Sequence, residues 1–205
     1  MLPGMQNRLY FIVMTGRTHD LAAITALGAV VFFGPIPTFT LSTALVSVLA
    51  NQIGGILPDI DQPTAPFWRN LPVGKFFGRI FDKLLGGHRF ITHSILGLVL
   101  FGLLAKALLL ALSPIMPHTD IEFVWWAFMI GMISHLVMDS FTKEGVPWLL
   151  PIPIKFGLPP LKRMRITTGK FAEAAVIFPG IIALDVWFCA SHYYVLLEFV
   201  QQHLV

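Results

Sequence analysis

Long apolar segments, ended by proline, glycine or charged residues, make up most of the chain. A helix needs about 20 apolar residues to cross the hydrocarbon core of a membrane, where it also satisfies its own backbone hydrogen bonds. Five segments reach or approach that length: residues 21–33, 38–57, 91–112, 121–141 and 172–199. The pattern predicts an all-α fold, a polytopic membrane helical bundle of about five transmembrane helices, in a single domain over residues 1–205.

The first predicted span is the shortest of the five. Residues 21–33 can cross a membrane only if their helix tilts or begins before His19. Pro35 and Pro37 separate this segment from the second span, and Pro58 ends the second span, because a helix does not run through these prolines. Two long polar loops remain, at residues 58–90 and 142–171.

The composition agrees with a membrane protein. The chain is 56% hydrophobic and 12% charged, with a mean hydropathy of +0.75, whereas soluble domains carry about 25% charged residues. The net charge of +3 comes without a dense basic run, which excludes a nucleic-acid-binding face. Cys189 is the single cysteine, so any metal ion must be held by nitrogen and oxygen atoms.

Lysine and arginine fall almost entirely on one side of this predicted topology. Of the 14, all except Lys106 lie before the first span or in the loops 58–90 and 142–171. Because cytoplasmic loops carry the excess of Lys and Arg, we expect a cytoplasmic N-terminus and an outward C-terminus. Lys106 lies inside the third span, where we expect it to snorkel or to pair with an acidic side chain.

Most of the side chains that could bind a metal ion gather at the cytoplasmic ends of the predicted spans. Ionisable residues are costly at these positions unless they have partners. The eight that converge are His19, Asp59, Asp61, His88, His93, His135, Asp139 and Glu173. Their number and type predict a metal site built from nitrogen and oxygen ligands.

Residue spacing supports the same site. His135 and Asp139 are four residues apart, so on a helix they differ by about 40° and project to one side. His88 and His93 can reach one site only if His88 lies in the loop before the third span. Asp59 and Asp61 follow a proline, and the pair suits one metal ligand and one supporting partner. Which aspartate has which role stays open here.

Several short motifs together resemble one family. They are Thr18-His19, Leu57-Pro58-Asp59-Ile60-Asp61, His88-Arg89 with Thr92-His93-Ser94, and Ser134-His135 with Asp139, Thr142 and Gly145. Over about residues 14–173 the chain resembles the YdjM-type inner-membrane metal-dependent hydrolases, a family similar to the zinc-dependent phospholipase C and fungal nuclease superfamily. The resemblance implies a bacterial inner membrane location and phosphoester chemistry. It implies metal binding by His19, Asp59, His93, His135 and Asp139, with Asp61, His88 and Glu173 as further candidates.

The expected activity is hydrolysis at the cytoplasmic face. Eight donors exceed what one tetrahedral zinc ion requires, so two or three divalent ions are expected, zinc first and manganese as the alternative. Asp61, Arg89 and Glu173 are the predicted catalytic residues: either carboxylate would accept a proton, and Arg89 would offset transition-state charge. At headgroup depth, the expected substrate is a phospholipid or another lipid phosphoester, admitted past an interfacial loop at residues 145–170. No nucleic acid and no obligate protein partner is expected.

Two other interpretations stay open. A metal-ion or proton-coupled transporter also uses paired His and Asp, although such sites usually lie near the membrane midplane between repeats, and no repeat is visible in this sequence. A non-catalytic adaptor would use a closed metal site to hold its helices together, whereas an enzyme keeps an open coordination position. Arg89 and Glu173 could also form an ordinary ion pair.

Overall fold

Helices make up the regular secondary structure of the chain. The computed structural model describes residues 3–34, 40–85, 89–152 and 154–204, with side chains from residue 16 onward except 66 and 204. Within these ranges it contains no β-strand and two isolated bridges, Thr142 with Ile166 and Val146 with Phe156. The predicted all-α fold is confirmed.

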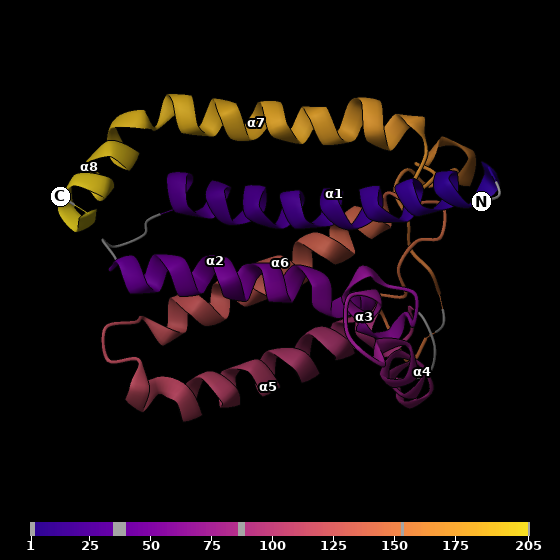
Figure 1. Ribbon diagram of the computed structural model, residues 1–205, viewed down its shortest axis with the longest axis horizontal. Helices are drawn as coiled ribbons and strands as arrows, with labels where there is room; N and C mark the ends of the chain where they lie inside the picture. The colour runs from indigo at the N-terminus through magenta and orange to yellow at the C-terminus, as the bar shows by residue number, and fades with distance from the viewer. Residues whose placement is uncertain (1–2, 35–39, 86–88, 153, 205) are drawn as a thin grey trace.

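Among the described residues, four helical segments are long and apolar enough to cross a membrane. They are α2 with the 3₁₀ turn η1 (Leu41–Ile56 and Leu57–Asp61), α5 with η3 (Ile95–Leu112 and Ser113–Ile115), α6 (Ile121–Ser140), and the π-helical turn η5 with α7 (Glu173–Ile177 and Phe178–Ser191). A further helix, α1, spans Pro3–Phe33 and packs beside α2 and α7 (Figure 1). The predicted span 21–33 is therefore the C-terminal part of a longer helix that begins before His19.

Polar side chains determine where three of these helices begin. Thr40 stands one position before α2, Ser94 before α5 and Asp120 before α6. Each side chain accepts hydrogen bonds from backbone amides two or three positions further on, at 3.0 to 3.2 Å. Such caps pair amides that the first turn of a helix otherwise leaves without a partner.

Helices α2 and α6 touch through their backbones. A Cβ atom added to Gly54 would collide with the carbonyl oxygen of Phe128, and one added to Gly131 would collide with that of Asn51. The side-chain amide of Asn51 donates to the Ala127 carbonyl at 3.1 Å within the same contact. Small residues and interhelical hydrogen bonds allow helices in lipid to approach this closely. The contact holds the C-terminal end of α2 against the middle of α6.

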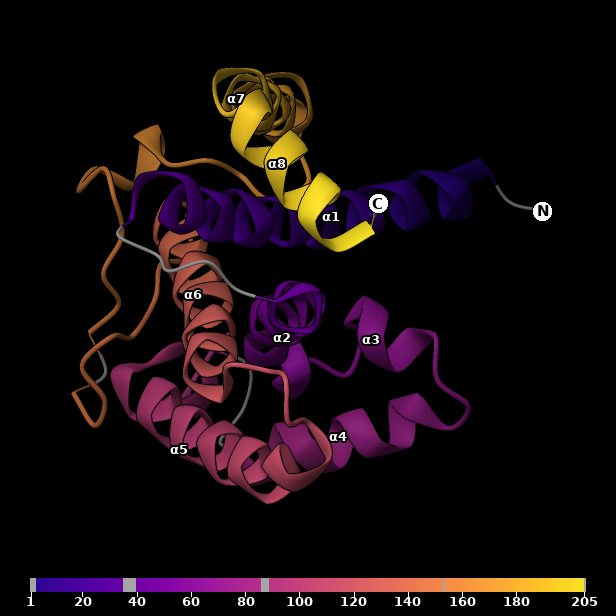
Figure 2. The ribbon, with the colours of Figure 1, turned by 90° about the vertical axis from the view of Figure 1, so that its left-hand side faces the viewer.

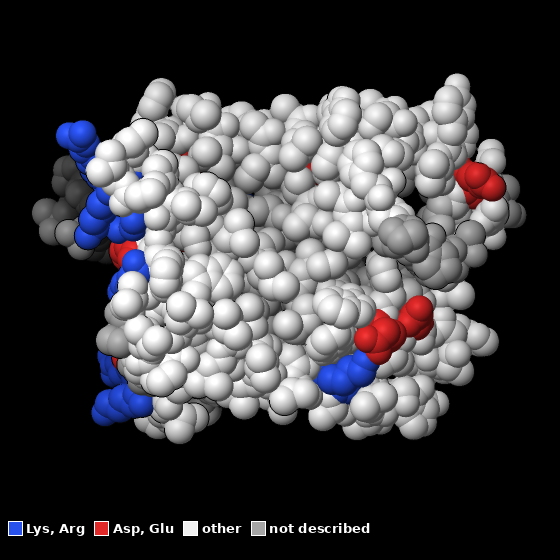
Figure 3. Space-filling model, turned by 180° about the vertical axis from the view of Figure 1, so that it is seen from behind, with Lys and Arg blue, Asp and Glu red and all other residues white. Residues whose placement is uncertain are grey.

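Lysine and arginine gather at one end of the molecule (Figure 3). This is the end at which α1 begins and where α3 and α4 lie (Figure 1). Lys106 is far from it, and pairs with Glu122 while lying 5.0 Å from the centre of the Trp125 ring. The expected pairing of Lys106 with an acidic side chain is confirmed.

The sequence predicts that the last span, residues 172–199, ends at residue 199, and this end is wrong. Helix α7 stops at Ser191, and a separate helix, α8 (Tyr193–Leu204), turns toward α1 and α2 (Figure 2). Ser191 Oγ donates to the Trp187 carbonyl at 2.7 Å, and His192 leaves the helical conformation with φ −114° and ψ 23°. Such side-chain bonds compete with the backbone ladder of the helix, which hydrophobicity alone does not show.

The loop 58–90 contains helices of its own. After η1 come α3 (Pro66–Arg69) and α4 (Gly74–Leu84), and the short 3₁₀ turn η2 (Ile91–His93) precedes α5. Helix α4 packs on α3 and on η1. The other long loop, 142–171, has one 3₁₀ turn in the part that the structure describes, η4 (Lys162–Met164). Both loops lie at the end of the bundle that carries the lysine and arginine residues.

Replacing Gly131 by alanine is expected to lower the free energy of unfolding by about 1–3 kcal/mol, because the added methyl group collides with the backbone of α2. Gly180→Ala is the matched control, since a Cβ atom at Gly180 meets nothing within 4 Å. Thermal unfolding of the detergent-purified proteins measures the difference. A Gly131→Ala variant as stable as Gly180→Ala would contradict the direct backbone contact between α2 and α6.

Candidate metal centre

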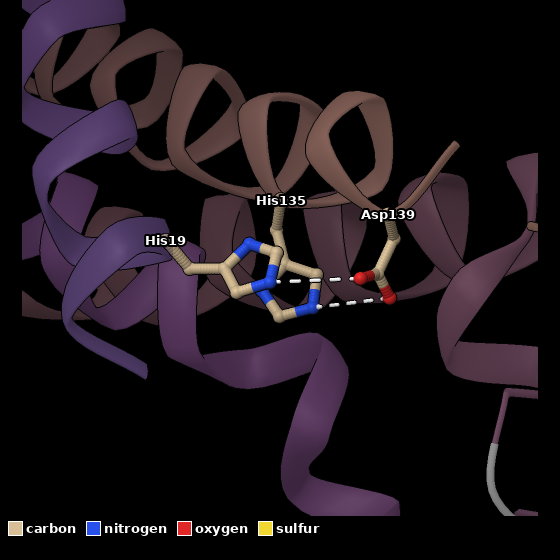
Figure 4. Close-up of side chains that lie close together, drawn as sticks. All are labelled: His19, His135 and Asp139. Carbon is tan, nitrogen blue, oxygen red and sulfur yellow. Dashed lines mark ion pairs between the residues drawn. The ribbon is translucent and has the colours of Figure 1, made fainter. Parts of the chain in front are cut away.

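His135 and Asp139 lie one turn apart near the end of α6, and each is only 1% exposed. Both side chains project into the space that His19 also enters (Figure 4). His135 Nδ1 lies 2.6 Å from the carbonyl oxygen of Gly55 in α2. Because a carbonyl oxygen can only accept a hydrogen bond, Nδ1 carries the proton, and Nε2 presents its lone pair to the cluster.

His19 reaches the same space from α1. Its ring stacks on that of His135, with centroids 4.1 Å apart, and its Nε2 lies 3.5 Å from Asp139 Oδ1 (Figure 4). These three residues each offer one ligand atom, and the three atoms lie within 4.8 Å of one another. Helix α1 therefore contributes a candidate ligand, as the sequence predicts.

His93 enters the cluster from η2, and it is fully buried. Its Nδ1 lies 2.9 Å from Thr92 Oγ1, and the Thr92 hydroxyl donates to Asp61. Since the one hydroxyl proton goes to the carboxylate, His93 Nδ1 is the donor to Thr92, and its Nε2 faces Asp139 Oδ2 at 3.3 Å. Burial lowers the pKa of His93, which favours the neutral ring that metal ions bind.

Asp59 completes the group from η1. Its Oδ1 lies 3.6 Å from His135 Nε2 and 3.8 Å from His93 Nε2. The Asp59 side chain is 25% exposed, whereas the other four candidate ligands are buried. The cluster therefore reaches the molecular surface on the side of Asp59.

Asp61, two residues later in the same turn, is fully buried. Its Oδ2 accepts hydrogen bonds from the Thr92 hydroxyl and from the Arg89 backbone amide, the latter at 3.0 Å. It acts on His93 through Thr92, with 3.9 Å between His93 Nδ1 and Asp61 Oδ2. The sequence left open which aspartate faces the site and which supports it. In the structure Asp59 faces the imidazoles, and Asp61 orients one of them.

Arg89 is the cation of the cluster. Its guanidinium Nη2 lies 2.7 Å from Asp139 Oδ2, and Nη1 donates to Thr142 Oγ1 at 3.2 Å. Its backbone has a φ of 59°, a left-handed conformation that costs a non-glycine residue about 1–3 kcal/mol and persists only where the surroundings impose it. The contacts of both its backbone and its side chain hold Arg89 in place beside the carboxylates.

The distances in the cluster fit a bound divalent cation. Two ligand atoms that each lie about 2.1 Å from a tetrahedral zinc ion are about 3.4 Å apart. The imidazole and carboxylate atoms are 3.3 to 3.8 Å apart, and His135 Nε2 has no hydrogen-bond partner among the described residues. Two three-residue groups, His19–His135–Asp139 and Asp59–His93–His135, overlap at His135. They form one compact centre, in which the two oxygens of Asp139 face different imidazoles.

The charges in this region also favour a cation. Asp59, Asp61 and Asp139 bring three carboxylates into the cluster, and Arg89 brings one positive charge. Carboxylates removed from water are costly unless they are paired or coordinate a metal ion. A divalent ion would offset the two negative charges that Arg89 does not balance.

One of the described site residues that the sequence predicts, Glu173, does not join the cluster. The carboxylate of Glu173 accepts hydrogen bonds from Thr18 Oγ1 at 2.8 Å and from the Gly169 amide at 2.6 Å. It ties α1, next to His19, to the start of η5, and is absent from both ligand groups. Arg89 pairs with Asp139 and not with Glu173. His88 lies outside the described residues.

The sequence reasoning missed the groups that orient the histidines. The Thr92 hydroxyl and the Gly55 carbonyl fix the direction of His93 and His135. Thr92 carries a weak sequence signal, since it stands directly before a candidate ligand. Gly55 carries none, because its contribution is a backbone oxygen in an apolar helix.

A cavity of about 550 Å³ lies elsewhere, between α1, α2 and α8. Apolar side chains form most of its lining, and none of the candidate ligands is among them. This space is therefore separate from the candidate metal centre.

Comparisons with known proteins agree with the membrane fold. The family model for the YdjM inner membrane protein matches residues 14–205. The uncharacterized protein YvsG of Bacillus subtilis strain 168 is 28% identical over 165 residues, which cover 80% of this chain and 88% of that protein. The inner membrane protein YdjM of Escherichia coli K12 is 31% identical over 152 residues, 66% of this chain and 70% of that protein, and that of Shigella flexneri gives the same values. No solved structure matches the chain.

The buried state of His93 predicts how stability depends on pH. Histidine in an unfolded chain titrates near 6.5, and burial lowers the pKa of His93 in the folded protein. Below about pH 6.5 the unfolded chain therefore binds more protons, and the metal-free protein loses stability as the pH falls toward the folded pKa. Apparent unfolding temperatures in chelator at pH 7.5 and 5.5 measure this loss.

His93→Gln should flatten that pH dependence, whereas His118→Gln, in the exposed loop between α5 and α6, should keep it. An unchanged slope in His93→Gln would assign the pH dependence to other groups.

Proposed function

Because the chain belongs to the YdjM family of inner membrane proteins, and its candidate ligands meet at one end of the bundle, we propose that it is a membrane-embedded metal-dependent hydrolase. One observation carries the proposal. The Gly55 carbonyl holds His135 Nδ1, so that Nε2 faces Asp59 and Asp139 and has no hydrogen-bond partner among the described residues. A second group that fixes the far nitrogen of an imidazole is typical of metal-binding histidines.

The donor set suits zinc first, with manganese as the alternative. His19, Asp59, His93, His135 and Asp139 would hold the metal. When bound, such an ion supplies Lewis acidity, which makes water nucleophilic near neutral pH and polarises a phosphoryl oxygen.

The protein's own groups would orient the substrate and balance charge. Arg89 is fixed at both its backbone and its guanidinium, and it lies at the edge of the carboxylate cluster. From there it can bind a phosphate oxygen and offset negative charge that develops in the transition state. Asp61 and Glu173, the proton acceptors suggested by sequence, have oxygens engaged in hydrogen bonds, so we assign them to positioning His93 and α1.

The proposed substrate is a phosphoester of a lipid or of another membrane-associated molecule, cleaved at the cytoplasmic face. The cluster lies at the end of the bundle that carries the lysine and arginine residues, which is the cytoplasmic end by the positive-inside rule. Its open side, at Asp59, belongs to the turn that ends α2. Headgroups of the inner leaflet would lie at this depth.

Transport is the weaker alternative. Buried Thr43, Ser47 and Asn51 follow one another at single-turn intervals along α2 and lead toward the cluster. This polar row packs against α6, where Gly54 and Gly131 bring the two backbones into contact. Passage of an ion would require that contact to open. A purely structural metal is disfavoured by the partial exposure of Asp59, because structural sites are closed.

Metal content tests the first half of the proposal. Detergent-purified protein should contain stoichiometric zinc or manganese, measured by inductively coupled plasma mass spectrometry, and both His135→Ala and Asp139→Ala should lose it because each removes a central ligand. His118→Ala, with an exposed histidine outside the cluster, should retain the metal. A folded wild-type protein that binds no metal under any loading condition would contradict the proposal.

Turnover tests the second half. Phosphate release from lipid phosphoesters should require the bound metal, and Arg89→Gln should lower kcat/KM on the order of 10²–10³-fold by removing a charge-stabilising donor. Arg163→Gln is the control, since Arg163 is exposed in the other loop. If metal-loaded protein in proteoliposomes moves the ion across the membrane and releases no phosphate, the transporter alternative holds.

A further inference from the structure

Helix α4 (Gly74–Leu84) presents an apolar side that is exposed in the folded chain. Phe76 and Leu84 are 61% and 71% exposed, and Phe77 and Ile80 beside them are also exposed. At about 100° per residue, these four side chains fall within one third of the helix circumference. Large apolar side chains grouped in this way mark a surface that contacts a membrane or a protein.

The opposite side of α4 is attached to the body of the protein. Gly78 lies against the Trp68 ring, and the Phe81 ring is 5.4 Å from it. The Trp68 indole in turn donates to the Ile60 carbonyl of η1 at 2.8 Å. These contacts determine which side of α4 is buried, so the exposure of the apolar side follows from the packing.

Basic residues line one edge of that apolar side. Lys75, Arg79 and Lys83 recur every four residues and form a row along the helix, and all three are exposed. Asp82 is the only acidic residue within α4. A helix with an apolar side and a lysine and arginine edge lies in the boundary between headgroups and acyl chains, where anionic lipids attract it.

The direction of α4 fits this location. In Figure 2, α2 is seen end-on while α4 is seen side-on, so α4 crosses the bundle axis at a large angle. It lies at the end of the bundle where lysine and arginine gather (Figures 1 and 3). A helix with this direction, packed on the turn that ends α2, runs parallel to the membrane surface.

We propose that α4 is an in-plane membrane helix that inserts Phe76, Phe77, Ile80 and Leu84 into the leaflet at the metal-centre end, and binds anionic phospholipid headgroups through Lys75, Arg79 and Lys83. The occupant of the apolar side is lipid because the basic edge complements anionic headgroups. Lipid binding by α4 requires neither a bound metal ion nor hydrolysis.

Spin-label accessibility tests the insertion. In a Cys189→Ser background, reconstituted in nanodiscs of phosphatidylcholine and phosphatidylglycerol, labels at Phe76→Cys and Ile80→Cys should collide preferentially with oxygen, which concentrates in lipid. A label at Lys75→Cys, on the basic edge, should collide preferentially with a water-soluble nickel chelate. Nickel preference at positions 76 and 80 would place α4 in water and overturn the proposal. Protection from both reagents would also overturn it, because a protein would then cover the apolar side.

Lipid titration tests the headgroup contacts. The Kd of detergent-purified protein for phosphatidylglycerol, measured by native mass spectrometry, should rise about tenfold or more in the variant Lys75→Gln, Arg79→Gln, Lys83→Gln. The variant Lys155→Gln, Lys162→Gln, Arg163→Gln removes the same charge from the other loop and should change the Kd less than about twofold. Equal rises of the Kd in both variants would show general charge attraction and overturn the assignment to α4. An unchanged Kd in the α4 variant would also overturn it.

Discussion

The hydrogen bond from His135 to the Gly55 carbonyl joins α6 to α2 next to the backbone contacts of Gly54 and Gly131. The bond is possible because Gly54 and Gly131 carry no side chain that would hold the helices apart. It fixes the tautomer of His135 and directs Nε2 toward Asp139, one turn further along the same helix. Helix packing and the direction of a candidate metal ligand therefore depend on one backbone contact.

The candidate ligands His19 and His93 reach His135 from separate segments, and each has its own support. Glu173 ties α1 to the start of η5 next to His19, and Asp61 acts on His93 through Thr92. Each of these carboxylates accepts hydrogen bonds away from the cluster centre, which leaves Asp59 and Asp139 to face the imidazoles. The strained backbone of Arg89 fits the same arrangement, because its amide and its guanidinium contact two different carboxylates. These are the contacts that a preorganised site requires from its surroundings.

The sequence predicted the residues of the cluster better than their roles. His135 and Asp139 could be paired from helical spacing alone, and the ends of the spans placed His19, Asp59 and His93 at the same face. The separate roles of Asp59 and Asp61 could not be derived, because they depend on the turn of η1, where the two carboxylates point in different directions. Glu173 was placed at the correct end of the bundle, but position along the membrane normal does not show which way a side chain points. The break at Ser191 also lacked a hydrophobicity signal, since it arises from side-chain hydrogen bonds to the helix backbone.

The turn η1 connects the two surfaces on which these proposals depend. It carries Asp59, the partly exposed candidate ligand, and its Ile60 carbonyl accepts the hydrogen bond from Trp68 that anchors α4. Asp59 and Ile60 are therefore adjacent residues of one short turn, and α4 packs directly on this turn. If α4 lies in the headgroup region, the Asp59 side of the candidate metal centre lies near the same depth, because α4 packs directly on η1. The proposed lipid-binding surface and the candidate metal centre would then share one support, since η1 both carries Asp59 and anchors α4.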